Sequence, residues 1–155
     1  MSAEEAKNLS ELFWRELGGL RTGMLGLAGT SDAHSQPMTA HFDAPPGPLW
    51  FYVRADSPLV AASGGGRDAV FHYTGRGHDL YACVRGTLTA SRDQAVIDRF
   101  WSDDVARWFP DRNSPQVTLL RFEPANAEIW LPTEGPDARS FKFGSAEDVR
   151  AEVKL

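Results

Sequence analysis

The chain of 155 residues contains a single cysteine, Cys83. One cysteine excludes a disulfide framework within the chain, and disulfides are the usual mark of oxidising compartments. We therefore expect a cytoplasmic protein. Cys83 falls inside an expected strand, where a free thiol packs as a small apolar side chain.

Long apolar runs are also absent. No window of the sequence approaches the roughly 18 apolar residues that span a membrane. The N-terminus carries Glu4, Glu5 and Lys7 before the first apolar cluster, which is unlike a signal peptide. The sequence predicts a soluble protein without a membrane partner.

Positive charge is scarce and scattered. Lysine and arginine number 16 against 21 aspartate and glutamate residues, which gives a formal net charge of −5. No basic run is long enough to follow a phosphate backbone, so we expect no nucleic-acid partner.

Common catalytic signatures are missing as well. The chain has no G-x-S-x-G elbow, no P-loop, no complete G-x-G-x-x-G and no H-E-x-x-H. The histidines His34, His41, His72 and His78 lack the short spacing of metal ligands, so we expect no metal site. His78 beside Asp79 in a glycine-rich turn is either a ligand-orienting group or a turn residue that caps the backbone.

Apolar periodicity predicts two amphipathic helices. The first spans 3–17, with Ser2 and Glu5 at capping-box spacing. The second spans about 93–108, begins after the capping residue Asp93 and ends where a proline forbids continuation.

Six strands separated by turn residues account for most of the remaining sequence. The strongest is Leu49-Trp50-Phe51-Tyr52-Val53, which follows a proline-rich turn. A short helical turn is expected after it, capped by Asp56 or Ser57 and with Pro58 at its first position. The other strands are expected at about 24–27, 36–43, 69–73, 79–90 and 116–131, with a break at Pro124.

The order of these elements predicts a mainly β protein. A closed antiparallel barrel with flanking helices fits the short turns best, and a two-sheet sandwich is the alternative. We expect a single domain over 1–155, with the barrel at about 22–131. The tail 132–155 is polar and carries an expected short helix near 145–152.

Five tryptophans are many for a chain of this length. Large aromatic side chains bury roughly 150–250 Å² each, so Trp14, Trp50 and Trp101 are expected in a core or an interface. Trp108 and Trp130 lie at the ends of expected elements, where core packing and contact with a planar ligand are both open.

Four stretches, taken in order, resemble one protein family. They are Gln36-Pro37-Met38-Thr39-Ala40, then Leu49-Trp50-Phe51-Tyr52-Val53 leading to Asp56-Ser57-Pro58-Leu59-Val60, then Val84-Arg85-Gly86-Thr87-Leu88, and Ala127-Glu128-Ile129-Trp130. From about residue 9 to 131 the chain is similar to the pyridoxamine-phosphate-oxidase-like split barrels, and in particular to their general stress protein group.

The resemblance implies a six-stranded split barrel that forms a homodimer and holds FMN at the subunit interface. FAD, F420 and haem are the alternative cofactors. In such proteins the strand matching 36–41 follows the flavin ring, the segment matching 52–59 surrounds the phosphate, and the tryptophan matching Trp130 packs near the ring from the partner subunit. The implied cofactor-binding residues are Gln36, Met38, Thr39, His41, Tyr52, Val53, Arg54, Ser57, Leu59, His78, Trp108 and Trp130.

Two positions depart from the family pattern. Family members carry Arg where this chain has Gln36 and Lys where it has Leu59, and both cations neutralise the flavin phosphate. Arg54, Arg67 and Arg76 are the candidates to supply that charge in this chain.

Three functions stay open from the sequence. The first is a flavin-dependent oxidoreductase with a small substrate, the second is a flavin-binding stress protein without turnover, and the third is a barrel that binds a different ligand. His41 matches a substrate-contacting Lys of the true oxidases, so pyridoxamine phosphate is not the expected substrate. The sequence identifies no catalytic residue.

Overall fold

The computed structural model describes residues 1–29 and 34–143. Its helices are α1 (Ala3–Gly19), α2 (Pro58–Ser63), α3 (Gln94–Phe100) and α4 (Asp103–Ala106). Its strands are β1 (Thr22–Leu27), β2 (Gln36–Thr39), β3 (Leu49–Arg54), β4 (Arg67–Thr74), β5 (Tyr81–Ser91), β6 (Val117–Trp130) and β7 (Arg139–Lys142). The strands form one antiparallel sheet in the order β2-β1-β4-β5-β6-β3, and β7 pairs with β6.

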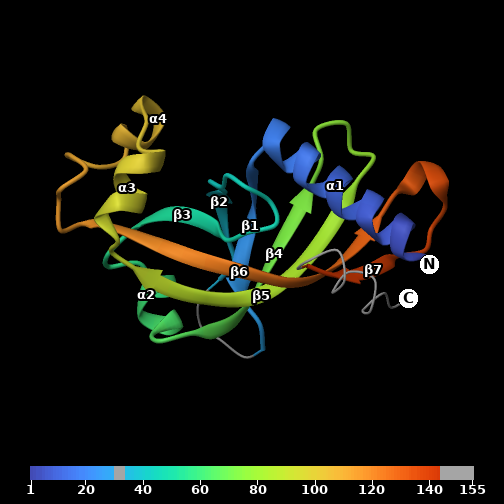
Figure 1. Cartoon of the computed structure of the whole chain (residues 1–155). Helices are drawn as coiled ribbons and strands as arrows, with labels where there is room; N and C mark the ends of the chain where they lie inside the picture. The colour runs from blue at the N-terminus through green and yellow to red at the C-terminus, as the bar shows by residue number, and fades with distance from the viewer. Residues whose placement is uncertain (30–33, 144–155) are drawn as a thin grey trace.

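The sheet curves strongly, so that its first and last strands approach each other (Figure 1). His41, just after β2, exchanges two backbone hydrogen bonds of 2.8 Å with Trp50 of β3. Phe51, Phe71 and Phe122 point inward from three strands and are fully buried. The predicted mainly β fold of barrel type is confirmed, with a split between β2 and β3 beyond this bridge.

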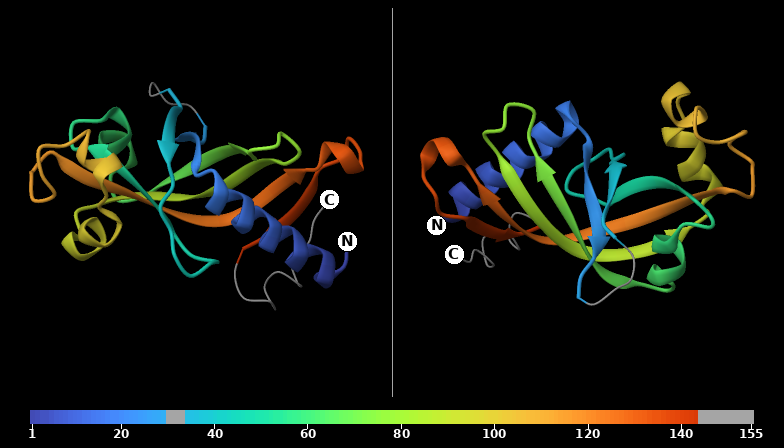
Figure 2. Two further views of the ribbon diagram at one scale, coloured as in Figure 1. Left: turned by 90° about the horizontal axis from the view of Figure 1, so that it is seen from above. Right: turned by 180° about the vertical axis from the view of Figure 1, so that it is seen from behind.

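The elements divide between the two ends of the curved sheet. Helices α2, α3 and α4 lie at one end, while α1, β7 and the N-terminus lie at the other (Figures 1 and 2). Helix α1 begins at the predicted cap, where the Ser2 hydroxyl accepts a hydrogen bond from the Glu5 N–H at 3.1 Å. It continues two residues beyond the predicted end and buries Leu9, Phe13 and Leu17.

Three consecutive carbonyls fix the connection from α1 to β1. The Gly19 carbonyl accepts from the Arg76 guanidinium at 2.5 Å, and the Leu20 carbonyl accepts from the Tyr73 hydroxyl at 2.5 Å. The Arg21 carbonyl accepts from the N–H of Ala40 at 2.7 Å. Burial raises the pKa of Tyr73 to about 12, so its hydroxyl remains a donor at neutral pH.

Two helices, α3 and α4, replace the single helix predicted over 93–108. Helix α3 ends at Phe100, and the Ser102 hydroxyl then accepts a hydrogen bond from the N–H of Val105 at 3.4 Å. Serine favours such a cap over a helix interior, so the chain begins a new helix there. Ile97 of α3 and Val105 of α4 are buried in a small second core.

Strand β6 continues through Pro124, where a break was predicted. Opposite it, Arg85 pairs with Asn126 while Gly86 pairs with Pro124, so Ala125 is the extra residue of a bulge. A bulge accommodates a proline because the ladder does not need its missing N–H there. Gly86 is required at this point, since a Cβ would clash with a backbone oxygen of β6.

A seventh strand, β7, lies in the segment predicted to be a polar tail. It follows a 3₁₀ turn at Pro132–Glu134 and buries Phe141 against α1 and β6. A strand of four residues, Arg-Ser-Phe-Lys, has too little alternation to be recognised in sequence. The helix expected near 145–152 lies outside the described residues. No helix within 1–29 and 34–143 has both the length and the apolar character that a membrane span needs.

Candidate functional site

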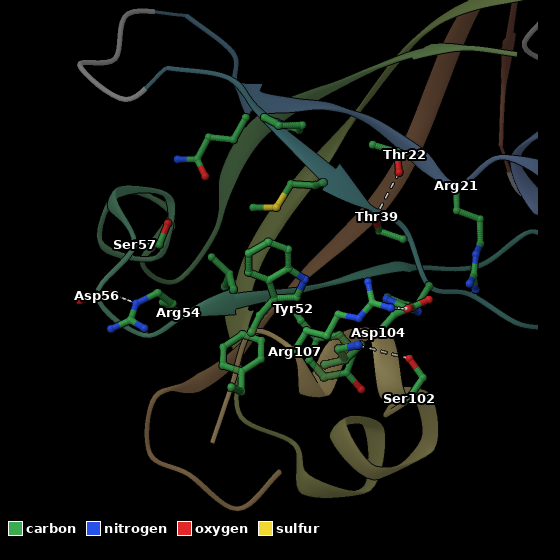
Figure 3. A pocket seen from close by; sticks show the side chains of 18 of the residues that line it. Arg21, Thr22, Thr39, Tyr52, Arg54, Asp56, Ser57, Ser102, Asp104 and Arg107 are labelled. Atoms are coloured by element: carbon green, nitrogen blue, oxygen red, sulfur yellow. Dashed lines mark hydrogen bonds and ion pairs between the residues drawn. The ribbon is translucent and has the colours of Figure 1, made fainter. Parts of the chain in front are cut away.

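A pocket of about 1040 Å³ lies at the end of the sheet where β2, β3, α2 and the segment after α4 meet. Its charged and hydroxyl-bearing residues gather at two ends. Figure 3 shows Arg54 and Ser57 on one side of the pocket and Arg21, Thr22 and Thr39 on the other.

The first end, here called the Arg54 end, consists of Arg54, Asp56 and Ser57 (Figure 3). Arg54 ends β3, and the Ser57 hydroxyl caps α2 by accepting from the N–H of Leu59 at 3.3 Å. The Arg54 Nε lies 3.2 Å from the Asp56 Oδ1, and both side chains are more than half exposed. Because an exposed ion pair contributes only about 0–1 kcal/mol, the guanidinium can accept a ligand anion at little cost.

The second end, here called the Arg21 end, consists of Arg21, Thr22, Thr39 and His41. Thr22 and Thr39 are partners in the β1–β2 ladder, and their hydroxyl oxygens lie 3.3 Å apart. Arg21 forms no ion pair with any residue that the structure describes. This end therefore offers an unneutralised guanidinium beside uncharged hydroxyls.

His41 completes the Arg21 end and is only 8% exposed. Its ring packs edge-on against Tyr52 at 5.2 Å between centroids and lies 5.7 Å from the Phe100 centroid. Burial, together with the positive charge of Arg21, lowers the pKa of His41 to about 4. The imidazole is thus neutral at physiological pH, and it makes no hydrogen bond with any described residue.

Apolar side chains form the wall between the two ends. Met38, Tyr52 and Phe109 line it, and Trp108 adds an indole that is 76% exposed. The Tyr52 hydroxyl donates to the carbonyl of Ile97 at 2.6 Å, and burial raises the pKa of Tyr52 to about 12. Such a wall suits a flat, largely apolar ligand.

The pocket is positive although the whole molecule is acidic. Arg21, Arg54 and Arg107 line it together with Asp56 and Asp104, while the chain has a formal net charge of −5. Arg107 lies 3.7 Å from Asp104, and both are largely exposed. Local charge opposite to the net charge draws an anionic ligand to the pocket. In the described part of the chain, no group of three or more His, Cys, Asp or Glu is placed to hold a metal ion.

Most of the sequence-predicted cofactor residues meet in this pocket. They come from β2 and the residues just after it, β3, the cap of α2 and the segment after α4, which the fold brings together (Figure 3). The nine that line the pocket are Gln36, Met38, Thr39, His41, Tyr52, Val53, Arg54, Ser57 and Trp108.

The other three predicted residues lie away from the pocket. Leu59 is fully buried in the main core beneath α2. His78 has a φ of 58° in the turn that joins β4 to β5, where Thr74 pairs with Tyr81. Tyr81 in turn pairs with Trp130, so His78 and Trp130 share the opposite end of the sheet.

Two pocket cations, Arg21 and Arg107, were missed by the sequence analysis. Of the three candidates proposed there, only Arg54 lines the pocket, and Arg67 and Arg76 each donate to a backbone carbonyl elsewhere. The one available signal for Arg21 is its position just before the strand that pairs with 36–39.

Comparison with known proteins assigns the chain to a family. Residues 8–147 match the family model described as pyridoxamine 5'-phosphate oxidase like. The chain belongs to this family. The fold agrees, since this pyridoxamine 5'-phosphate oxidase like protein has the antiparallel barrel-type sheet that the sequence resemblance implied.

Three solved structures are similar to it in both sequence and fold. A general stress FMN/FAD binding protein from the phytopathogen Xanthomonas citri is 41% identical, with a TM-score of 0.76 over 81% of this chain and 89% of that one. A protein of Xanthomonas campestris pv. campestris assigned to the general stress family is also 41% identical, with a TM-score of 0.75 and coverage of 81% and 88%.

The third structure is assigned as general stress protein 26 of Jannaschia sp. CCS1. It is 36% identical, with a TM-score of 0.72 over 79% of this chain and 78% of that one. The search of curated proteins found no match. The chain is thus a homologue of general stress proteins, one of them named for FMN/FAD binding.

Proposed function

We propose that this protein binds FMN in the pocket between β2, β3 and the segment after α4. The observation that carries the proposal is the convergence of nine predicted cofactor residues on one pocket of about 1040 Å³. Pockets for ligands of drug size run from about 300 to 1,000 Å³, so the space is sufficient. The Xanthomonas citri homologue, named for FMN/FAD binding, supports the same cofactor.

The Arg54 end supplies the charge for the flavin phosphate in this proposal. Ser57 lies on the same side of the pocket as Arg54 (Figure 3), whose only ion-pair partner among described residues is the exposed Asp56. Leu59 occupies the position of the family lysine but is buried in the core. Arg54 therefore takes over the role of the two missing cations, since a guanidinium binds phosphate through paired hydrogen bonds.

The flavin ring fits the wall between the two ends. β2 begins the sheet path and pairs only with β1 among the described strands, so polar groups along its other edge are available to the rim of the ring. Met38 of β2 and the exposed Trp108 offer apolar contact to its faces.

We propose a flavin-dependent oxidoreductase that acts on a small substrate, with a non-catalytic flavin-binding stress protein as the alternative. FMN supplies hydride or electron transfer when bound. Neither His41, with a pKa of about 4, nor Tyr52, with a pKa of about 12, changes protonation near neutral pH. In this proposal the two side chains therefore position ligands and transfer no proton. A cytoplasmic location belongs to the same proposal and is supported by the single cysteine.

Titration of the flavin-free full-length protein with FMN tests the cofactor. We expect quenching of flavin fluorescence, and about tenfold weaker binding in Arg54→Gln because a charge-assisted hydrogen bond is lost. Arg67→Gln is the matched control, since Arg67 lies outside the pocket. A protein that leaves FMN fluorescence unchanged would contradict the proposal.

Turnover is tested on the loaded protein. Bound flavin is reduced anaerobically, and its reoxidation by candidate acceptors is timed against free FMN. Faster reoxidation than free FMN supports an oxidoreductase, whereas equal rates favour the non-catalytic alternative.

We further propose a homodimer in which a second copy covers the outward face of the sheet. A row of side chains, Met24, His72, Cys83 and Glu128, crosses four neighbouring strands on this face. Met24 and Tyr81 are 41% and 40% exposed, which is high for large apolar side chains. In a two-fold interface this row of side chains faces the same row of the second copy. Apolar side chains can then pack on apolar ones, and charged side chains can meet groups of opposite charge.

Trp130 gives this dimer a functional test. It lies eleven residues along β6 from Leu119, which pairs with Tyr52 in the pocket, and that length of strand spans about 35 Å. Trp130 would therefore reach an FMN site only from the partner subunit. We expect a dimer in sedimentation velocity and weaker FMN binding in Trp130→Ala; a monomer at micromolar concentration contradicts the dimer, and an unchanged FMN affinity limits Trp130 to packing.

A further inference from the structure

We propose that the Arg21 end of the pocket binds the anionic group of the substrate, a carboxylate or a phosphate. The inference rests on the proposed function, which gives the Arg54 end to the FMN phosphate and leaves a second cationic end without a ligand. It deepens that function by naming the chemical class that the flavin pocket takes as substrate: small organic anions.

The charge state of Arg21 is the first support. Arg54 and Arg107 face Asp56 and Asp104 at 3.2 and 3.7 Å, whereas Arg21 forms no ion pair within the described residues. A guanidinium carries five N–H donors in a planar fork that matches a carboxylate or phosphate. Arg21 therefore offers the pocket a complete, unshared anion receptor.

The backbone around Arg21 is already ordered. The carbonyls of Gly19, Leu20 and Arg21 accept hydrogen bonds from Arg76, Tyr73 and the N–H of Ala40. Only the Arg21 side chain loses freedom when an anion binds, and a preorganised backbone lowers the entropic cost of binding.

His41 is the second and independent support. Its side chain is 8% exposed, lines the pocket and has no hydrogen-bond partner among the described residues. Among the described residues only the Trp14 indole nitrogen is fully enclosed without a partner, so the His41 ring nitrogens open into the pocket, where a ligand group can bond to them. A neutral imidazole provides one donor and one acceptor, which suits a carbonyl or hydroxyl next to the anionic group.

The two ends are too far apart for one small anion to occupy both. The Arg21 carbonyl is bonded to the N–H of Ala40, next to the His41–Trp50 bridge, and Arg54 lies four residues along β3 from Trp50, which is more than about 10 Å. Figure 3 shows Arg54 and Arg21 on opposite sides of Tyr52. A phosphate at one end and a substrate anion at the other can therefore bind at the same time.

The test uses the flavin-loaded, full-length protein and two probes, inorganic phosphate and benzoate, at constant ionic strength. Binding is followed by the visible spectrum of the flavin and by the NMR signal of the His41 ring. In Arg21→Gln we expect probe affinity to fall at least about tenfold while FMN affinity stays within about twofold. Arg21→Lys should recover part of the loss, and Arg15→Gln, on the exposed face of α1, is the matched control.

The outcomes separate this inference from the proposed function. If FMN binds but Arg21→Gln holds both probes as tightly as the wild type, or Arg15→Gln weakens them equally, the Arg21 end is not an anion site. If Arg21→Gln weakens FMN instead, Arg21 belongs to the cofactor and the inference is overturned. A protein that binds no FMN fails the earlier titration, and the substrate role falls with it. A response to only one probe supports the inference and identifies the anion as phosphate or carboxylate.

Discussion

The two ends of the pocket differ in how their arginines are held. Arg54 has an aspartate oxygen 3.2 Å away, so its guanidinium shares its charge with a carboxylate before any ligand arrives. Arg21 has no carboxylate among the described residues and stands beside hydroxyls and a neutral imidazole. The comparison teaches that one pocket can suit a resident phosphate at a paired arginine and an exchanging anion at a free one.

The supports of the two arginines are separate as well. Arg54 ends a strand and pairs with Val117 of β6. Arg21 takes its place from Tyr73 of β4, from Arg76 in the turn after β4 and from the N–H of Ala40. A substitution at one end therefore leaves the backbone of the other end in place. Single variants can thus test the role of each arginine separately.

The largest expected effect comes from acidification, which acts on the Arg21 end through His41. The unfolded chain binds a proton at His41 with a pKa near 6.5, and the folded chain does so only near pH 4. The free energy of unfolding therefore falls as the pH drops from 6.5 toward 4, by about 3 kcal/mol at pH 4 from this group. Denaturant unfolding of wild type and His41→Gln at pH 7 and pH 4 measures the difference.

The wild type should lose more stability than His41→Gln between these two pH values. His34→Gln is the control, because His34 is exposed and lies outside both the pocket and the proposed dimer face. Equal losses in wild type and His41→Gln would mean that the folded protein accommodates a charged imidazole in the pocket.

The next largest effect tests the separation of the ends. The double variant Arg21→Gln/Arg54→Gln should bind FMN about tenfold more weakly than wild type, as Arg54→Gln does alone, because sites about 10 Å apart act independently. Fluorescence titration of both single variants and the double variant completes the cycle. A further loss of more than about threefold in the double variant would break the separation.

A smaller effect is expected at Arg107. This side chain is 75% exposed and lies 3.7 Å from Asp104, so removing its charge should change FMN affinity by less than about fivefold. Asp104→Asn is the matched variant, because it removes the ion-pair partner of Arg107 and keeps the arginine. If Arg107→Gln weakens FMN as much as Arg54→Gln does, the phosphate is held by the segment after α4.

The smallest effect links Arg21 to His41 directly. The charge of Arg21 is the second cause of the low pKa of His41, after burial. Arg21→Gln should therefore raise the pKa of His41 slightly, and NMR titration of the ring signal measures it. An unshifted pKa would place the two groups too far apart to share one ligand.

Much of the fold could be predicted because its signals are local. The cap at Ser2, the cap and proline at Ser57-Pro58 and the alternation along β4 and β5 each lie within a few residues of what they determine. The split into α3 and α4 was missed because Ser102 can sit within a helical pattern, and only its hydrogen bond to Val105 reveals the new cap.

The site divides in the same way. Residues on β2 and β3 were found because strand patterns and the family resemblance both mark them. Arg21 was not found, because its place depends on contacts between residues 53 and 57 positions apart, Tyr73 with Leu20 and Arg76 with Gly19. Sequence spacing carries no information about such contacts without a register for the sheet.

The fixed connection after α1 has a consequence for how this family can diversify. Helix α1 looks like an appendage to the barrel, yet its last turn leads directly into the residue that would select the substrate. Exchanging residues 16–21 between homologues would thus alter ligand preference while the flavin wall on β2 and β3 stays intact. In the proposed site, the last turn of the N-terminal helix would thus set the ligand preference of the pocket.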